Sequence, residues 1–302
     1  MRRAVLVVNP ISGSARRRGA VERFVRCARD GGVDVAVAPT AAAGDGARIA
    51  RDAAREDVPF VVAAGGDGTV NEVARGLLDV AGTRSALALL PLGTSNLVAR
   101  HLRVPLRPDG AADALVHGST TPFDTAEANG RPFVACAGVG LDAYVVEALT
   151  RRRRGHIGFH SYAAPVLQAA RGYDARAMHV RAADGREASG SLTLVLNTRP
   201  YAAFFEPAPG ASTRDGLLDV VVLRGGGTLR LARWAAAALR GRLLRDADAV
   251  HLRTPAVRID ADDALPWQID GDVGGRTPLD ILVRPAALRI VRPAAPGREE
   301  PA

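Results

Sequence analysis

The N-terminal part of the chain alternates between short apolar runs and longer segments in which apolar residues recur every three or four positions. The short runs have the length of buried strands, and the longer segments have the pattern of amphipathic helices. The predicted strands cover residues 4–8, 33–37, 60–64 and 86–90, and the predicted helices cover residues 20–28, 47–55, 70–78 and 97–102. Because strands alternate with helices, we expect a parallel α/β sheet, whose ligands bind beyond the carboxyl ends of the strands.

The pattern changes near Pro122, after which short strands and turns dominate. Residues 123–128 and 133–137 flank Asn129-Gly130, the strongest two-residue signal for a β-hairpin. Further strands are predicted at 177–181, 192–196, 217–223, 256–260, 267–270 and 279–283, with helices at 141–149, 156–170 and 229–239. The second half is therefore predicted to be β-rich and sandwich-like, and a chain of 302 residues is long enough for two domains.

One stretch, residues 59–72, combines a strand, a glycine-rich turn and a helix. Its sequence is P-F-V-V-A-A-G-G-D-G-T-V-N-E. Gly65, Gly66 and Gly68 let the backbone approach an anion closely, and the first N–H groups of a helix favour negative charge, so we expect a phosphate site. Asp67 would repel phosphate unless a cation lay between them, so we expect it to face Mg²⁺ on a nucleotide. The alternative is a tight turn with Asp67 as a helix cap.

The charged residues narrow the choice of function. All 40 basic residues are arginine, and the formal net charge is +8. The absence of lysine excludes a Schiff-base lysine, the standard P-loop and the strand lysine of protein kinases. A basic protein favours anionic partners such as nucleotides, anionic lipids or nucleic acid. Only 4% of the residues are aromatic and no nucleic-acid recognition motif is present, so we expect no nucleic-acid partner.

From the apolar runs and the cysteines we expect neither a secretory leader nor a membrane span. Cys27 and Cys136 are too few and too far apart for a disulfide framework or a zinc site, which fits a reducing cytoplasm. The apolar run after Arg3 is too short for a secretory leader, and no run approaches a membrane span. We therefore expect a cytoplasmic protein whose only membrane contact is peripheral, with an anionic inner membrane face. Arg151–Arg154 is the candidate for that contact, and a solvated charged face is the alternative.

Six motifs resemble those of one known family. They are N-P-I-S-G at 9–13, G-G-D-G-T-V-N-E at 65–72, P-L-G-T-S-N at 91–96, A-G-V-G-L-D-A at 137–143, D-G-L-L-D-V at 215–220 and D-G-D at 270–272. Their order resembles that of the diacylglycerol-kinase-type lipid kinases, most closely the soluble bacterial branch, with the sphingosine kinases as relatives. NAD kinases also carry G-G-D-G-T, but the combination with N-P-x-S-G and P-L-G-T-x-N is specific to the lipid kinases.

The resemblance implies an N-terminal α/β domain like that of NAD kinase and phosphofructokinase, followed by a C-terminal β-sandwich-like domain. The first domain would cover residues 1–122, joined by residues 285–302, and the second would cover residues 123–284. The last strand would return to the first domain, and the active site would lie in the cleft between the two.

The resemblance also implies which residues carry the function. ATP contacts are implied at Asn9, Pro10, Ile11, Ser12, Gly13, Thr40, Gly66, Asp67, Gly68, Thr69, Val70, Asn71, Glu72 and Thr94. A structural Mg²⁺ site is implied at the Ser212 carbonyl, the Asp215 carboxylate and the Leu217 carbonyl. The general base is implied at Asp272, the third position of D-G-D.

Some of these polar residues also have structural interpretations. Asp124 is a candidate second acid near the catalytic Mg²⁺, and the alternative is a cap at the start of the hairpin. Thr94 and Asn96 are candidates for binding phosphate or Mg²⁺-bound water, and the alternative is N-capping of the following helix. For Asp215 and Asp272 the alternative is turn chemistry.

Three positions depart from the family pattern. The family usually has Glu in place of Asp272, many members have Asp in place of Leu97, and a Lys often stands in place of Ser14. The leading interpretation is an ATP- and Mg²⁺-dependent lipid kinase that phosphorylates the hydroxyl of diacylglycerol or a related lipid alcohol. The alternatives are an NAD kinase and a catalytically decayed regulator that binds a nucleotide or a lipid. The sequence leaves a homodimer open.

Overall fold

The computed structural model describes residues 2–9, 15–151, 176–202 and 205–294. Its contacts divide the chain into two units, Met1–Phe123 with Ala287–Ala302, and Asp124–Ala286. The chain passes from one unit to the other within two long strands, β5 (Ser119–Ala128) and β16 (Leu279–Arg292). The predicted helix at 156–170, Arg152–Arg154 and residues 10–13 lie outside the described residues.

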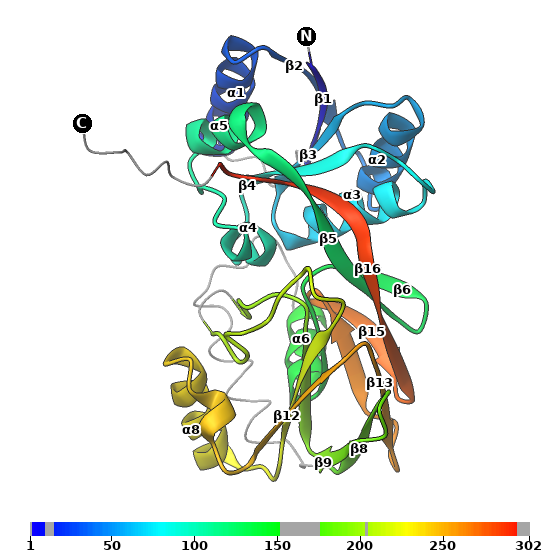
Figure 1. The fold of residues 1–302 in the computed structure, drawn as a ribbon. Coiled ribbons are helices and arrows are strands. Elements are labelled where there is room, and N and C mark those ends of the chain that lie inside the picture. Colours follow the sequence, from blue (N-terminus) through cyan, green and yellow to red (C-terminus); the bar gives the residue numbers. More distant parts are fainter. Residues whose placement is uncertain (1, 10–14, 152–175, 203–204, 295–302) are drawn as a thin grey trace, which may run out of the picture. The chain divides into compact units, whose positions relative to one another are not determined.

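The first unit is built on a parallel sheet in the strand order β2-β1-β3-β4 (Figure 1). Its strands are β1 (Arg2–Val8), β2 (Val33–Pro39), β3 (Phe60–Gly65) and β4 (Ala86–Pro91). The C-terminal end of β16 pairs with β4 in parallel, with Ile290 opposite Leu87. All six residues of β4 and Val61–Ala64 of β3 are buried, which explains why these strands are continuous apolar runs rather than alternating ones.

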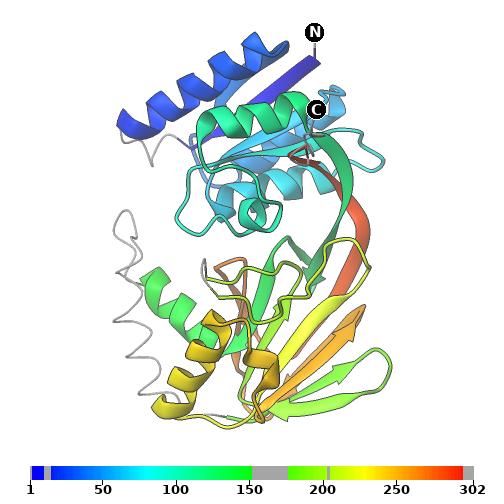
Figure 2. The ribbon, with the colours of Figure 1, turned by 60° about the vertical axis from the view of Figure 1, so that its left-hand side comes forward.

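The described residues of the first unit also form five helices. They are α1 (Ala15–Asp30), α2 (Asp45–Arg55), α3 (Asp67–Leu78), α4 (Leu97–His101) and α5 (Pro108–His117). α1 packs against α5, and α2 packs against α3 (Figure 2). α5 was not predicted from the pattern, although Pro108 occupies the first helical turn, where proline is favoured.

The contact between α2 and α3 leaves no room for a methyl group at Gly76. A Cβ atom there would lie 2.1 Å from the Ala47 carbonyl oxygen and 2.8 Å from the Ala50 Cβ. We expect Gly76→Ala to destabilise the protein by about 1–3 kcal/mol, because the two helices must separate. Gly19→Ala is the matched control, since Gly19 lies in α1 with open space around it, and it should stabilise by about 0.5–1 kcal/mol. Urea unfolding measures both variants, and a shift of the same sign in the two would contradict the packing described.

The second unit contains two β-sheets packed face to face. One is a six-stranded antiparallel sheet in the order β12-β11-β10-β7-β14-β15, and the other contains β9, β8, β13 and β16, with β5 and β6 at the side of β16. The remaining bounds are β6 (Arg131–Phe133), β7 (Cys136–Gly140), β8 (Met178–Ala182), β9 (Glu187–Gly190), β10 (Leu192–Leu196), β11 (Leu218–Leu223), β12 (Ala249–Thr254), β13 (Ala256–Ala261), β14 (Pro266–Ile269) and β15 (Asp272–Arg276). The helices are α6 (Leu141–Arg151), α8 (Thr228–Leu239) and a 3₁₀ turn at Leu243–Arg245.

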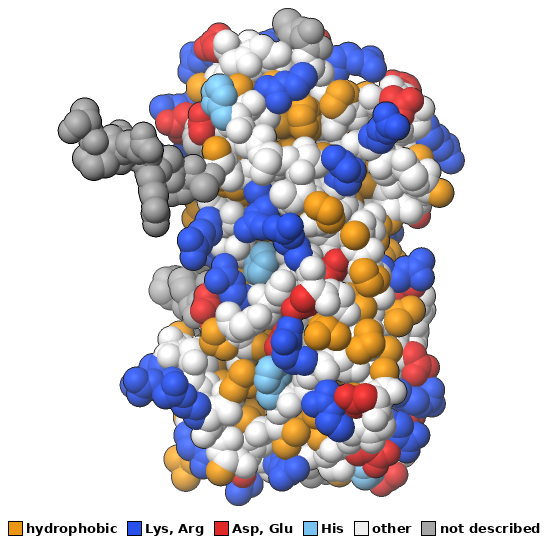
Figure 3. Space-filling model, viewed as in Figure 1, with side chains coloured by type: hydrophobic (Ala, Val, Ile, Leu, Met, Phe, Trp, Pro, Cys, Tyr) orange, Lys and Arg blue, Asp and Glu red, His pale blue; other side chains and the backbone are white. Residues whose placement is uncertain are grey.

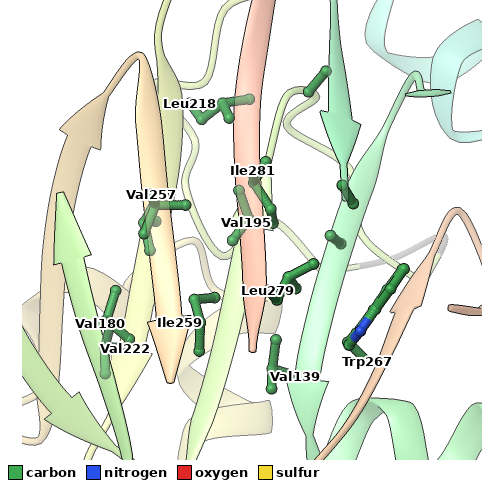
Figure 4. Packing of buried hydrophobic residues seen from close by; sticks show 14 of the residues in the cluster. Val139, Val180, Val195, Leu218, Val222, Val257, Ile259, Trp267, Leu279 and Ile281 are labelled. Carbon is green, nitrogen blue, oxygen red and sulfur yellow. The ribbon is translucent and has the colours of Figure 1, made fainter. Parts of the chain in front are cut away.

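The core of the second unit lies between these sheets. Val195 and Trp267 come from the six-stranded sheet, while Ile259 and Ile281 come from the opposite sheet, and all four are buried in one cluster (Figure 4). On β8 and β13 buried residues alternate with exposed ones, as expected for strands with one face on a core. The predicted α/β fold with a C-terminal β-sandwich is thus confirmed.

The predicted hairpin is correct at its turn and wrong in its second strand. Ala128 pairs with Arg131, and Asn129 and Gly130 both have positive φ (47° and 77°), as a tight two-residue hairpin turn requires. The second strand of the hairpin ends at Phe133 and not at residue 137. The chain then enters the other sheet as β7, so one apolar stretch supplies two strands on opposite sides of the core.

Candidate functional site

The loops that follow β3 and β4 contact one another through their backbones. The Leu92 N–H donates to the Gly65 carbonyl at 2.9 Å. A Cβ atom on Gly93 would lie 2.4 Å from the Gly66 Cα, so both loops need glycine at the point of contact. The two polar motifs at 65–72 and 91–96 therefore form one structural feature in the first unit, at the carboxyl ends of neighbouring parallel strands.

Asp67 lies at the first position of α3 and links the two loops. The helix starts three residues earlier than predicted, and its N-cap is Gly66, so Asp67 does not cap its own helix. Its Oδ1 instead accepts the Leu97 N–H at 2.6 Å, at the start of α4. Burial raises the pKa of Asp67, against the opposing effect of the Leu97 and Asn96 amides and of Arg100. A half-buried acid held at this place, next to the unpaired first amides of α3, suits a cation bound to phosphate.

Asn96 shapes the second loop. Its Nδ2 donates to the Gly93 carbonyl and its Oδ1 accepts the Gly93 N–H, both at 2.9 Å. Its backbone is left-handed (φ 49°), and its side chain is buried and makes no capping hydrogen bond to α4. Thr94 lies exposed between these two residues. Contact of Thr94 or Asn96 with a ligand stays a prediction.

Glu72 joins α3 to the loop before α2. Its two carboxylate oxygens accept the Gly44 N–H at 3.2 Å and the Gly46 N–H at 3.0 Å. Thr40, which precedes that loop, is buried, and its N–H donates to the Val8 carbonyl at 2.9 Å. These contacts give Glu72 and Thr40 roles in folding the first unit, and their predicted contacts with ATP remain predictions.

The other predicted ATP contacts are distributed in the same unit. Asn9 directly follows β1, whereas Pro10, Ile11, Ser12 and Gly13 lie outside the described residues. Gly65 ends β3, and Gly68, Thr69, Val70 and Asn71 belong to the first two turns of α3, where Val70 and Asn71 are buried.

Asp124 holds a loop of the second unit in place. Its Oδ2 accepts the Gly216 N–H at 2.8 Å and its Oδ1 accepts the Ala286 N–H at 2.7 Å, while its own N–H donates to the Thr213 carbonyl. Asp124 is buried. The structure thus brings it together with residues 212–217, the loop that the resemblance assigns to a structural metal ion, although the sequence placed Asp124 near a different cation.

The loop at 212–217 offers a limited set of oxygen ligands. Asp215 Oδ1 accepts the Leu217 N–H at 3.1 Å, and its Oδ2 forms an ion pair with Arg253. The carbonyls of Ser212 and Leu217 accept no hydrogen bond from the described residues. Two unpaired carbonyls and one carboxylate fit a hard cation such as Mg²⁺, with Arg253 as a competitor that the sequence did not reveal. Within the described part of the chain no group of three His, Cys, Asp or Glu side chains forms a metal centre.

Asp272 is the exposed first residue of β15. The turn before it is anchored by Asp270, whose carboxylate accepts the N–H groups of Val134, Ala135 and Cys136 at 2.8–2.9 Å. Asp270 therefore shapes the turn. The Asp272 carboxylate makes no hydrogen bond to the described residues, so it is available to accept a proton.

A second acid of the second unit, Asp142, had no predicted role. It lies in the first turn of α6, the helix that directly follows β7. Its Oδ2 accepts the Gln268 Nε2–H at 2.7 Å, and its Oδ1 accepts the Tyr201 hydroxyl. The residue is partly exposed, but its carboxylate is enclosed, and this burial raises its pKa to about 6, against the lowering effect of Gln268. A Cβ on Gly138 would overlap this carboxylate. Gly138 in the A-G-V-G-L-D-A motif was therefore the feature of the sequence that could have indicated an enclosed Asp142.

The raised pKa of Asp142 has a measurable effect on stability. Ionising this carboxyl is harder in the folded protein than in the unfolded chain, so its contribution to stability is lost as the pH rises from about 4 to about 6. The difference corresponds to roughly 3 kcal/mol at most. Asp142→Asn has no titrating group, so we expect its stability relative to the native protein to rise across this pH window. Urea unfolding at pH 4, 5, 6 and 7 measures it, and parallel curves for the two proteins would contradict the assignment.

Comparisons with known proteins agree with this architecture. Residues 3–128 match the family model of the diacylglycerol kinase catalytic domain, and residues 135–292 match that of the YegS C-terminal NAD kinase beta sandwich-like domain. The chain therefore belongs to the diacylglycerol kinase family of lipid kinases.

Individual relatives cover nearly the whole chain. A diacylglycerol kinase of Bacillus subtilis (strain 168) is 29% identical over 97% of both chains. A probable lipid kinase YegS-like of Pseudomonas aeruginosa is 32% identical over 93% of this chain and 92% of its own length. The crystal structure of a diacylglycerol kinase from Bacillus anthracis str. Sterne has a TM-score of 0.76 over 96% of this chain and 97% of that one. That structure is 22% identical in sequence, so it supports the fold alone.

Proposed function

We propose that the protein is an ATP- and Mg²⁺-dependent kinase that phosphorylates the hydroxyl of diacylglycerol or a related lipid alcohol, which gives a phospholipid such as phosphatidic acid. The observation that carries the proposal is the pair of glycine loops after β3 and β4, which meet backbone to backbone around Asp67. Backbone amides at the start of a helix bind phosphate, and an adjacent acid suits its cation.

Each residue has a defined part in the transfer. The amides of Gly66, Gly68 and Thr69 hold the phosphates, and Asp67 faces Mg²⁺, which would neutralise charge on the transferred group. Asp272 accepts the proton of the lipid hydroxyl. The oxygen of that hydroxyl forms a bond to the γ-phosphorus, and the bond between the γ-phosphorus and the β,γ-bridging oxygen breaks, so that ADP leaves.

A second cation would bind the loop at 212–217 in a structural role. The Ser212 and Leu217 carbonyls and the Asp215 carboxylate would hold it, and Asp124 supports that loop through Gly216. Because Asp124 uses both oxygens for backbone amides, we assign it to the support of this loop rather than to direct contact with Mg²⁺.

Membrane contact follows from a lipid substrate. None of the helices in the described part of the chain has the length and apolarity that a bilayer crossing requires. On the face shown in Figure 3, arginine side chains are spread over the surface with acidic side chains between them. We propose peripheral contact with an anionic membrane. Arg151–Arg154 is the candidate contact site, of which only Arg151, at the end of α6, belongs to the described residues. The cytoplasmic location and the homodimer stay predictions.

Labelled ATP and a panel of acceptors test the proposed function. The panel contains diacylglycerol, phosphatidylglycerol, a sphingoid base and NAD, each with and without Mg²⁺. We expect Mg²⁺-dependent label in diacylglycerol or another lipid alcohol. Label in NAD alone would instead make the protein an NAD kinase. Tight binding of ATP with no label in any acceptor would support a decayed regulator, for which Asp272 and Leu97 in place of the family's usual acids are the motivating observation.

A further inference from the structure

A chain of hydrogen bonds runs from Asp142 to the turn that carries Asp272. Gln268 lies on β14 at its centre. Its Nε2 donates to Asp142 Oδ2 at 2.7 Å, and its Oε1 accepts the Gly271 N–H at 2.8 Å. Gly271 is joined to Asp272 by a peptide bond, so these hydrogen bonds end directly beside the residue that carries the proposed base.

The direction of these hydrogen bonds depends on Asp142. An ionised carboxylate can only accept, so the nitrogen of the Gln268 amide must face it. The amide oxygen then faces Gly271, where an N–H group requires an acceptor. The Tyr201 hydroxyl donates to the other carboxylate oxygen and completes the arrangement. Gln268 is buried, with an exposed fraction of 2%, so little water is available to replace a lost partner.

The titratable groups on the strands packed against α6 form no hydrogen bond or ion pair with the Asp142 carboxylate in the described part of the chain. On β15, Arg276 pairs with Glu147 of α6 at 3.2 Å, and Asp272 is exposed. On β7 the titratable group is the buried Cys136 thiol. The hydrogen bonds of the Asp142 carboxylate in the described part of the chain are those from Gln268 and Tyr201, which are uncharged.

The turn at 270–272 has further anchors: the Asp270 N–H donates to the Cys136 carbonyl at 2.9 Å, and Asp272 pairs with Ile269 across β14 and β15. Asp270 fixes its beginning through three backbone amides, and Gln268 fixes its middle through Gly271. Gly271 has a positive φ of 87°, and a glycine there adopts many conformations unless something holds it. Asp272 comes next and its carboxylate has no partner of its own in the described residues, so its position depends on these anchors.

We propose that Asp142 and Gln268 are positioning residues for phosphoryl transfer, because they orient the backbone at Gly271 and thereby hold Asp272 in place. This inference rests on the proposed function and extends it to residues that touch neither ATP nor lipid. Misplacing a catalytic group by about 1 Å costs up to about 100-fold in rate, so the loss of this anchor should appear in kcat.

A swap of the carboxyl and amide groups tests the proposal. In Gln268→Glu, two carboxyl groups face each other and must share a proton. In the double variant Asp142→Asn/Gln268→Glu, the amide at position 142 donates to the carboxylate at position 268, which still accepts the Gly271 N–H. The number of hydrogen bonds and the net charge are then restored. The single variant Asp142→Asn completes this double-mutant cycle. Its kcat should fall less than that of Gln268→Glu, because the new amide can turn its oxygen toward Gln268.

Thr193→Val is the matched control, because Thr193 is a fully buried polar residue of the same unit whose hydroxyl contacts the Met178 sulfur and not this chain. We expect Gln268→Glu to lower kcat by roughly 10- to 100-fold, with the KM for ATP unchanged. The loss should deepen between pH 7 and pH 9 as the shared proton leaves. The double variant should recover kcat to within about threefold and lose this pH dependence, while Thr193→Val should keep the kcat of the native protein.

The outcomes separate this inference from the proposed function. A native protein that phosphorylates no lipid contradicts the proposed function, and the inference falls with it. A native protein that is active, with Gln268→Glu equally active or the double variant no better than Gln268→Glu, overturns the inference alone. Amide exchange provides a readout that does not depend on activity. The Gly271 N–H should be protected in the native protein and exchange at least about tenfold faster in Gln268→Glu, and fast exchange in the native protein would contradict the hydrogen bond itself.

Discussion

Asp67→Asn is expected to reduce phosphoryl transfer by about 10³-fold or more while the protein stays folded. The amide oxygen of the new side chain can still accept the Leu97 N–H, so the link between the two loops survives. Only the negative charge is removed, and with it the partner for Mg²⁺. Burial raises the pKa of Asp67, so the loss of its charge should not destabilise the protein. Initial rates with labelled ATP and thermal unfolding measure the two effects.

The control for this variant is Asp109→Asn. Asp109 lies in the first turn of α5 in the same unit and pairs with Arg23 at 3.2 Å, away from the two glycine loops. This variant should keep full activity, because Asp109 has no part in the proposed transfer. It should also keep its stability, because exposed ion pairs contribute little to the free energy of unfolding. If Asp67→Asn retained more than about a tenth of the native rate, Asp67 would not be the acid that faces the metal.

Asp272→Asn is expected to lower kcat by about 10² to 10⁴, the range measured for general bases. Asp272→Glu should retain or raise activity, because the family usually has Glu at this position. Both variants should fold normally and bind ATP as the native protein does, since Asp272 is exposed and makes no hydrogen bond to the described residues. Steady-state kinetics measure kcat and the KM for ATP of both variants.

Asp262→Asn provides the comparison for Asp272→Asn. Asp262 is another exposed acid of the second unit, in the connection between β13 and β14. Its removal should leave kcat unchanged, and it should change the free energy of unfolding by no more than about 0.5 kcal/mol. Complete inactivity of Asp272→Glu would argue against Asp272 as the base, and full activity of Asp272→Asn would exclude it.

The sequence predicted most of the secondary structure, because most elements carry a strong local signal. The buried strands of the first unit are uninterrupted apolar runs, and the turn at Asn129-Gly130 has the two residues that a tight hairpin prefers. β9 and β15 were missed for the opposite reason. Glu187–Gly190 and Asp272–Arg276 contain few apolar residues and are strands because a neighbouring strand pairs with them.

The partners of the polar side chains were harder to predict than the site itself. The glycine loop and Asp67 were recognisable from their order along the chain. Glu72 and Asp124 were assigned to ligands, yet their carboxylates accept backbone amides 26 to 162 residues away in sequence. Such contacts depend on the tertiary fold, so no local pattern reveals them. The same applies to the Asp142 and Gln268 pair, whose members are 126 residues apart.

In the proposed kinase, the amides after β3 hold a phosphate chain whose cation faces Asp67. A crystal structure of the protein with Mg²⁺ and a non-hydrolysable ATP analogue tests this arrangement most directly. We expect phosphate oxygens within hydrogen-bond distance of the N–H groups of Gly66, Gly68 and Thr69, with Mg²⁺ reached by Asp67 directly or through one water. A nucleotide bound elsewhere, or a phosphate chain with no cation between it and Asp67, would contradict it.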